Sequence, residues 1–326
     1  MKQLSLLGEP PRPEDAPGPV DAAPAPAALE ALAQKLDRRL RLGTSSWAFP
    51  GWTGLVYAGA PKRQLLSRNG LCAYARHPLL NTVGVDSGFY APLDRARLAR
   101  YAAQVPADFR FLVKAPAAVT DRYRRAEGGR PGELNPGFLD PALALEQAVA
   151  PFRDELGERA GVLLFQLPPL GRGITSNPRR FAEDLYRFLR RLPDGPTYAV
   201  EVRDEALLTP DLAAALHHGG AAPSLASHPR MPALPEQGAL FAAHAADGPL
   251  VIRWLLRHNR GYDEARERYQ PFDRLAEPDP DTRRAIIALI RAALAQDREV
   301  FVIANNKAEG SSPRSLIELA RELVAA

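Results

Sequence analysis

Short apolar runs alternate with longer amphipathic stretches from residue 40 to the C-terminal end of the chain. Runs of four to six mainly apolar residues have the usual length of a strand, and stretches with apolar residues three to four positions apart predict helices. The predicted strands are Leu40–Thr44, Thr82–Asp86, Arg110–Lys114, Val162–Leu167, Tyr198–Arg203, Ala222–Leu225, Leu250–Trp254 and Val300–Ala304. The predicted helices are Leu93–Gln104, Pro141–Leu156, Pro178–Leu192, Thr209–His217, Asp281–Ala295 and Ser312–Val324.

This alternation predicts parallel strands with helices packed outside them, because a parallel connection needs a crossover segment. Eight such units over residues 41–326 fit a (β/α)8 TIM barrel, which typically has about 250 residues. The sixth unit is the weakest, since no clear helix follows Ala222–Leu225, and residues 257–280 form a long charged insertion. An open doubly wound sheet is the alternative. No G-x-G-x-x-G motif follows the first strand, which counts against dinucleotide binding, and no cofactor is predicted.

The N-terminal region has a different composition. Residues 8–28 are mainly proline, alanine and acidic residues, and such a segment cannot bury enough apolar surface to offset the entropy of ordering. We therefore expect residues 1–38 to be a disordered leader with a short helix at Leu29–Arg38, and residues 39–326 to form the barrel domain. The first 28 residues are predicted to be dispensable for stability.

Polar residues appear only at the ends of the predicted strands. Asp86, Lys114 and Gln166 end three of them, Glu201 and Arg203 end another, and the remaining ones are Arg253, Asn305 and Asn306. In a barrel these positions converge on the carboxyl-end face, where catalytic groups of this architecture lie.

The alternation of side chains along a strand assigns each residue to a face. Val200 and Val202 are expected to contact the helices, so that Glu201 and Arg203 point into the barrel mouth. Asp86 and Lys114 are placed inside by the same argument, and Gly84 is expected to leave room beneath Asp86. Burying several charges is costly unless they are paired. A ligand pocket is one interpretation, and an ion network that merely plugs the barrel is the other.

Composition narrows the classes of function. The single cysteine, Cys72, excludes an internal disulfide, and no signal peptide or membrane span is evident, so we expect a cytoplasmic protein without a membrane partner. The chain carries 42 basic and 38 acidic residues and a net charge of +4. Because the basic residues are scattered among acidic ones, the high pI of about 9.3 is a weak argument for a polyanion partner. No spacing of Cys and His predicts a metal site.

Six sequence blocks carry a resemblance to a known family. The blocks are GTSSWAFPGW at 43–52, TVGVDSGFY at 82–90, FLVKAP at 111–116, LLFQLPP at 163–169, AVEVR at 199–203 and VIANNKAEGSSP at 302–313. Together they resemble the YecE-like family, domain of unknown function 72, over nearly the whole chain after the leader. The resemblance implies a (β/α) barrel and implies no particular activity.

The chain departs from the family pattern at two places. The family usually has Glu where this chain has Gly84 and Asn where it has Asp86, so that Asp86 either restores a carboxylate one position along the same face or marks an altered site. The family often has His where this chain has Asp204. A histidine acid/base at that position is therefore not available here.

The residue types suggest roles. Glu201 is the best candidate for a general base, because nearby cations would keep it ionised, and Asp86 and Lys114 complete the predicted catalytic set. Lys114 is expected to clamp an anion rather than form a Schiff base, since Arg203 and Arg253 suit carboxylate or phosphate binding. The predicted substrate-binding residues are Arg203, Arg253, Gln166, Asn305, Asn306, Tyr90 and Trp47.

Two functions remain open. The first is an enzyme, a hydrolase, lyase or isomerase, that uses acid/base chemistry on a small anionic molecule. The second is a protein that binds nucleic acid or another polyanion without catalysis, which needs a long basic groove instead of a tight pocket of mixed charge. If Glu201 serves a ligand, Glu201→Gln is expected to leave folding nearly intact, whereas in a plug the substitution would be strongly destabilising.

Overall fold

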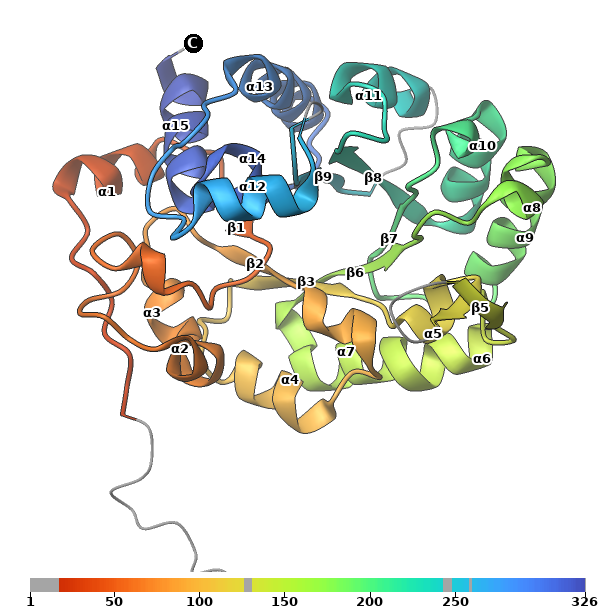
Figure 1. Cartoon of the computed structure of the whole chain (residues 1–326), viewed down its shortest axis with the longest axis horizontal. Coiled ribbons are helices and arrows are strands. Elements are labelled where there is room, and N and C mark those ends of the chain that lie inside the picture. The colour runs from red at the N-terminus through yellow and green to blue at the C-terminus, as the bar shows by residue number, and fades with distance from the viewer. Residues whose placement is uncertain (1–17, 126–130, 243–247, 258–259, 326) are drawn as a thin grey trace, which may run out of the picture.

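The computed structural model of the chain describes residues 18–125, 131–242, 248–257 and 260–325. Eight parallel strands close into a barrel, which confirms the predicted TIM-barrel fold and excludes the open sheet (Figure 1). The bounds of all eight strands agree with the predicted ones to within two residues. The barrel strands are β1 (Leu40–Thr44), β2 (Thr82–Val85), β3 (Arg110–Lys114), β6 (Ala160–Gln166), β7 (Tyr198–Glu201), β8 (Ala221–Ser227), β9 (Leu250–Trp254) and β10 (Val300–Ala304).

The six predicted helices are also present. They are α4 (Arg95–Ala102), α9 (Pro178–Leu189), α10 (Pro210–Gly219), α13 (Pro280–Ala295), α15 (Ser312–Ala325) and the stretch from α6 (Pro141–Ala144) to α7 (Ala150–Leu156). This last stretch contains a π-helical segment, Leu145–Val149, which ends two residues before Pro151. Proline lacks an N–H and crowds the carbonyl one turn earlier, which accounts for the local widening of the helix.

Several elements were not predicted from the sequence. They are α2 (Arg63–Asn69), α3 (Leu71–Tyr74), α5 (Ala117–Thr120), α8 (Arg172–Thr175), α11 (Leu234–Ala242), α12 (Tyr262–Tyr269), α14 (Asn306–Glu309), the hairpin of β4 (Tyr123–Arg125) and β5 (Pro131–Leu134), and short 3-10 turns at Pro50–Trp52, Asp86–Tyr90, Gly157–Arg159 and Glu205–Leu207.

The prediction that the sixth unit lacks a helix is wrong. Gln237 of α11 accepts a hydrogen bond from the Ala226 N–H at 3.0 Å and donates one to the Ala226 carbonyl at 2.9 Å, a tertiary anchor that local periodicity cannot show.

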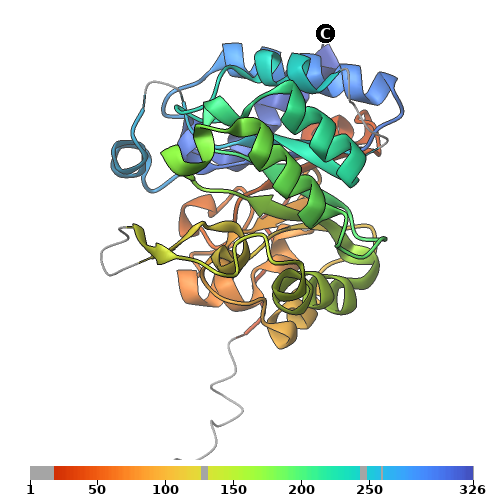
Figure 2. The same ribbon diagram turned by 90° about the vertical axis from the view of Figure 1, so that its right-hand side faces the viewer.

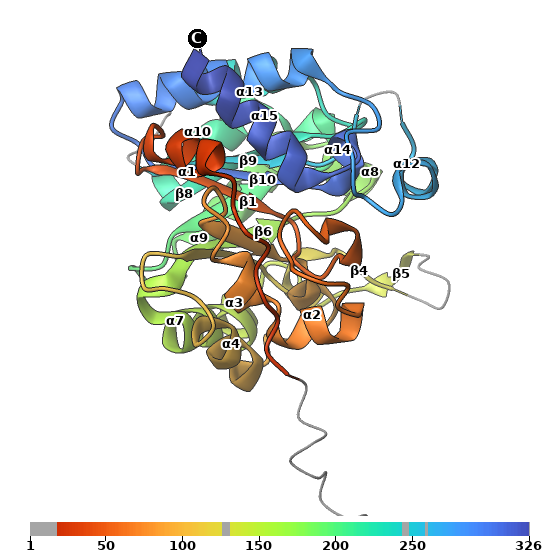
Figure 3. The ribbon, with the colours of Figure 1, turned by 90° about the vertical axis from the view of Figure 1, so that its left-hand side faces the viewer.

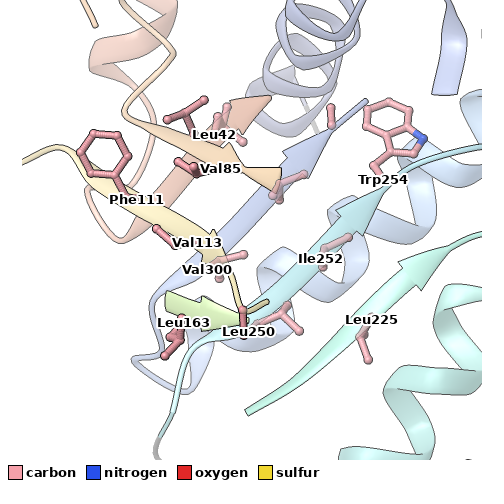
Figure 4. Close-up of a cluster of buried hydrophobic side chains, with 14 of the residues drawn as sticks. Leu42, Val85, Phe111, Val113, Leu163, Leu225, Leu250, Ile252, Trp254 and Val300 are labelled. Atoms are coloured by element: carbon pink, nitrogen blue, oxygen red, sulfur yellow. The ribbon is translucent and has the colours of Figure 1, made fainter. Parts of the chain in front are cut away.

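The barrel has two apolar layers. Outward-facing residues such as Val85, Phe111 and Val113 belong to the cluster that packs beneath the helices (Figure 4). A separate cluster of buried residues fills the interior of the barrel, among them Leu112, Ala199 and Phe301. The strand alternation predicted from the sequence therefore holds, and polar side chains are left for the mouth.

Both α12 and the β4–β5 hairpin project on the same side of the barrel, as two opposite views show (Figures 2 and 3). The hairpin follows β3 and α12 follows β9, so both lie at the carboxyl-end face and form part of its rim. No helix in the described part of the chain is long and apolar enough to cross a membrane.

The leader prediction needs a correction for residues 18–28, while residues 1–17 lie outside the described part. Val20 is buried, the Ala23 N–H donates to the Val56 carbonyl at 3.0 Å, and the Ala58 N–H donates to the Asp21 carbonyl at 2.9 Å. The predicted short helix is α1 (Ala27–Gln34). This proline-rich segment is ordered because residues 56–58 supply hydrogen-bond partners and a buried site that its own composition lacks.

A chain that begins at residue 29 is therefore expected to be less stable than one that begins at residue 18. The loss of one buried valine and two backbone hydrogen bonds amounts to on the order of 3 kcal/mol. Urea denaturation of the two truncated chains measures the difference. Equal midpoints would contradict the observed docking of residues 18–28.

Candidate functional site

Five charged side chains meet at the carboxyl-end face, and we call them the ionic cluster: Asp86, Lys114, Glu201, Arg203 and Arg253. Each comes from the end of a barrel strand or from the residues just after it. The closed barrel brings together β2, β3, β7 and β9, which contribute these residues. The structure therefore brings together the five charged residues that the strand pattern predicted at this face. The chemical role of each one depends on its distances to the others and on its charge.

Arg253 is the centre of the cluster. It is 3% exposed, and its two terminal nitrogens donate to the two Asp86 carboxylate oxygens, each at 3.2 Å. Its Nε lies 3.9 Å from Glu201 Oε2, which is too far for a hydrogen bond but close enough for strong attraction. Arg253 therefore joins two carboxylates and is not free to clamp a ligand, contrary to the role predicted for it.

Glu201 lies beneath the mouth and is fully buried. Its Oε1 accepts a hydrogen bond from Arg203 Nε at 2.8 Å, and its Oε2 accepts one from Ser224 Oγ at 3.4 Å. Burial raises the pKa of this carboxyl, but Arg203, Arg253 and Lys114 outweigh burial, so that the pKa is lowered and Glu201 stays ionised at neutral pH. With its oxygens engaged and no exposed surface, Glu201 is suited to hold Arg203 in place.

Lys114 differs from the other members of the cluster. It forms no salt bridge with any residue that the structure describes, and its Nζ lies 4.0 Å from the centre of the Phe89 ring. Its pKa is lowered to about 8, chiefly by burial and in part by the repulsion of Arg253 and Arg203, while Asp86 opposes the shift. The cluster contains three cations and two carboxylates, and Lys114 is the cation left without a close counter-ion.

The carboxyl of Asp86 lies at the edge of the cluster. Burial raises its pKa, but the attraction of Arg253 and Lys114 more than compensates, and the pKa is lowered overall. Its side chain is 35% exposed, in contrast to that of Glu201. Asp86 is therefore the carboxylate of the cluster that a ligand can reach.

A hollow of about 380 Å³ opens above Lys114, and we call it the lysine pocket. Lys114, Gln166 and Arg203 line it from the barrel, and His228 and Arg230 line it from the loop after β8. Gln166, which the sequence placed among the binding residues, is thus directed into the same hollow as Lys114.

A second, larger hollow of about 1220 Å³ begins beside Asp86 and extends between α2 and α4, and we call it the arginine cleft. Asn305 and Lys307 line its inner part, and Arg68 and Arg100 are among the residues that line its outer part. Tyr90, which is 83% exposed, lines both the cleft and the lysine pocket. Its ring therefore stands where the two hollows meet.

The other predicted residues have mixed outcomes. Trp47 is buried, donates its indole N–H to the Leu66 carbonyl at 2.9 Å and contributes only part of its surface to the cleft. Asn305 Oδ1 accepts a hydrogen bond from the Lys307 N–H at 3.0 Å and lines the cleft. Asn306 is a correction, because it is buried and its Oδ1 accepts from the N–H and hydroxyl of Ser312, both at 2.8 Å. It therefore holds the start of α15 and does not face the mouth.

The structure shows what surrounds Gly84 and Asp204, two positions at which this chain departs from the family pattern. A Cβ on Gly84 would lie 3.2 Å from Ser45 Cα and 3.4 Å from the Thr44 carbonyl oxygen, so the expected room beneath Asp86 is absent. Asp204 accepts a hydrogen bond from the Leu170 N–H at 2.7 Å and fastens the loop after β6.

Sequence reasoning missed the residues that complete the mouth. Phe89 beneath Lys114, Ser224 on Glu201, and the arginines of α2 and α4 carry no signal in a strand pattern. In the described ranges, no group of three or more His, Cys, Asp and Glu side chains is placed to hold a metal ion.

The comparisons with known proteins agree with the fold. The family model described as protein of unknown function DUF72 matches residues 41–326. A crystal structure of a DUF72 family protein from Thermotoga maritima is 17% identical, with a TM-score of 0.58 and coverage of 87% of this chain and 98% of that one. A DUF72 family protein from Enterococcus faecalis is 16% identical, with a TM-score of 0.55 and coverage of 88% and 96%. Among curated proteins, none matches the sequence.

Proposed function

This chain belongs to the DUF72 family of proteins of unknown function, and from that premise we propose that it is an enzyme that performs acid/base chemistry on a small anionic molecule at the mouth of its barrel. The observation that carries the proposal is the unpaired Lys114 in a pocket lined by two further cations, Arg203 and Arg230. An anion in the lysine pocket would supply the close counter-ion that Lys114 lacks among the described residues.

The dimensions and donors of the lysine pocket support a small ligand. Its volume of about 380 Å³ falls within the range of about 300–1,000 Å³ that small-molecule sites occupy. The Arg203 guanidinium, held by Glu201, and the Lys114 ammonium provide charged donors, and Gln166 provides an amide. Such a set binds a carboxylate or a phosphate by charge-assisted hydrogen bonds.

Lys114 is also the group best suited to move a proton. Its pKa of about 8 is close to neutral pH, so both the ammonium and the free amine are accessible, as general acid/base catalysis requires. Glu201 was predicted to be the base, but its burial and its engaged oxygens make it a positioning residue in this proposal. Asp86, which is more exposed, lies beside the reacting group and adds negative charge there.

The test is the substitution Lys114→Met, which keeps the length of the side chain and removes its charge. Small phosphates and carboxylates that raise the melting temperature of the wild-type protein identify ligands, and calorimetry gives their affinities. We expect the substitution to weaken binding at least about tenfold, because a charge-assisted hydrogen bond contributes roughly 1.5–3 kcal/mol. Wild-type affinity should also fall as the pH rises through about 8, where Lys114 loses its charge.

The matched control is Lys35→Met, at the end of α1 and away from the mouth, which is expected to leave binding unchanged. Turnover of each bound compound is followed by mass spectrometry. Binding that is insensitive to Lys114→Met would contradict the site, and Lys114-dependent binding without turnover of any bound compound would contradict the enzyme.

A further inference from the structure

The charged residues that line the two hollows at the mouth are almost all cations. The arginine cleft is lined by Arg63, Arg68, Arg97, Arg100 and Lys307, and the lysine pocket adds Lys114, Arg203 and Arg230. Asp86 is the one carboxylate among the described residues that line either hollow. The chain as a whole has 42 basic and 38 acidic residues, so this face is a strong local departure from the overall balance.

Two arginines of the cleft differ in their partners from the paired arginines of α9. On α9, Arg180 and Arg187 both form salt bridges with Asp184, each at 3.1 Å, as expected of a solvated helix face. In the cleft, Arg97 Nε lies 3.7 Å from Asp94 Oδ2, whereas Arg68 and Arg100 are exposed and form no salt bridge with a described residue. Exposed guanidinium groups without a carboxylate partner among the described residues, such as these two, suit the phosphates of a polyanion.

Two exposed aromatic rings stand along the same cleft. Tyr90 is 83% exposed and Tyr262 is 60% exposed, and both line the cleft. Tyr262 lies on α12, and its ring is 4.1 Å from Lys307 Nζ. Neither ring is needed for packing at that exposure, so both are available to stack on a planar group.

The position of Tyr262 is held by a network in the insertion after β9. Glu277 accepts hydrogen bonds from Arg260 at 2.8 Å and from the Tyr269 hydroxyl at 2.7 Å, and these two residues flank or belong to α12. The helix is thereby tied to the segment that leads into α13. Tyr262 is thus presented on an anchored element.

We propose that the ligand of this face is a single strand of nucleic acid. Its phosphates follow the arginine cleft toward the lysine pocket, and unpaired bases stack on Tyr90 and Tyr262. A single strand is favoured over a duplex, because a duplex hides the faces of its bases, whereas a basic groove with aromatic platforms suits unpaired ones. The inference rests on the anion site of the proposed function, and it replaces the small molecule at that site with a phosphate of the strand.

The experiment measures binding of a fluorescent single strand of about 12 nucleotides, which lies within the site sizes of single-strand binding domains. The affinity of the wild-type protein is followed from about 50 to about 200 mM NaCl and compared with that of the variant Arg68→Gln/Arg100→Gln. Loss of two phosphate contacts should reduce the slope of log K against log salt by about 1.4. Tyr90→Ala and Tyr262→Ala should each weaken binding about tenfold with little change in slope.

The control is Arg190→Gln/Arg191→Gln, which removes two exposed arginines at the C-terminal end of α9, at the opposite end of the barrel. It should retain the wild-type affinity and slope. Three results would each overturn the inference. They are equal affinities for a duplex and a single strand, equal affinities for a mononucleotide and the strand, and a wild-type salt slope in Arg68→Gln/Arg100→Gln. If Lys114-dependent binding of small anions persists while no strand binds, this inference fails and the proposed function stands. If small anions do not depend on Lys114, the proposed function fails first.

Discussion

Replacing Glu201 with glutamine is expected to destabilise the protein by about 3–5 kcal/mol. The carboxylate is fully buried, Arg203 donates to it at 2.8 Å, and Arg253 lies 3.9 Å away. The amide keeps the shape but leaves two guanidinium groups facing a neutral partner in a buried site. Nearly normal folding of this variant was predicted for a Glu201 that serves a ligand, and strong destabilisation for one that belongs to an ion network.

Urea denaturation at neutral pH measures the loss, with Glu205→Gln as the control. Glu205 is exposed and forms no salt bridge with a described residue, so its variant should stay within about 0.5 kcal/mol of the wild type. The pKa of Glu201 is lowered in the folded protein. Its ionised carboxylate therefore contributes to the free energy of unfolding at pH values above the ordinary pKa of 4.5, and this contribution is lost as the pH falls through the folded-state pKa. The gap between wild type and Glu201→Gln should therefore narrow in acid. A midpoint equal to that of the wild type at neutral pH would show that the ion pairs do not support the fold.

The substitution Lys114→Met is expected to have the opposite effect and to stabilise the protein by roughly 1–3 kcal/mol at neutral pH. A fall in pKa from 10.5 to about 8 means that the folded state disfavours the ammonium by about 3 kcal/mol at most, and partial exposure of the side chain reduces this value. The wild-type protein should gain stability from this group as the pH rises from about 8 to 10.5, because there the unfolded chain binds the proton more tightly than the folded one. The variant should lack that gain.

Parallel denaturation of wild type, Lys114→Met and Lys35→Met at neutral and alkaline pH measures this effect. The free energy of unfolding of Lys114→Met is subtracted from that of the wild type at each pH. This subtraction removes the contributions of the other groups that titrate in the same range. A destabilised Lys114→Met would identify Lys114 as part of the structural network. It would also remove the main physical support for a ligand site.

These two predictions divide the ionic cluster. Asp86, Glu201, Arg203 and Arg253 pair with one another, and their charges support the fold at the mouth. Lys114 is expected to lower the stability of the folded state, because burial and the neighbouring arginines disfavour its charge. Residues that lower stability in exchange for chemistry are typical of functional sites. On these two predictions, the ion-network interpretation applies to the four paired residues and the pocket interpretation applies to Lys114.

The amino-acid sequence by itself determined the barrel and the face that carries the cluster. Period-two alternation in β2, β3 and β7 assigned Val85, Val113 and Val200 to the helix layer, and the structure agrees. This succeeded because a parallel strand is buried on both faces, so that a polar residue is tolerated only where the strand leaves the core. Asp86, Lys114 and Glu201 stand at those ends for that reason.

Only the tertiary structure decided which charges are paired. Asp86 and Arg253 are 167 positions apart in sequence, and no local pattern shows that they share two hydrogen bonds while Lys114 forms no salt bridge with a described residue. The arginine cleft is likewise formed by α2 and α4, which flank β2 in sequence and meet only across the folded surface. Residues 18–28 become ordered through Val56 and Ala58 for the same reason. Local composition sets which residues are buried or exposed along an element, whereas the partner of a charge or of a backbone N–H depends on how distant elements pack.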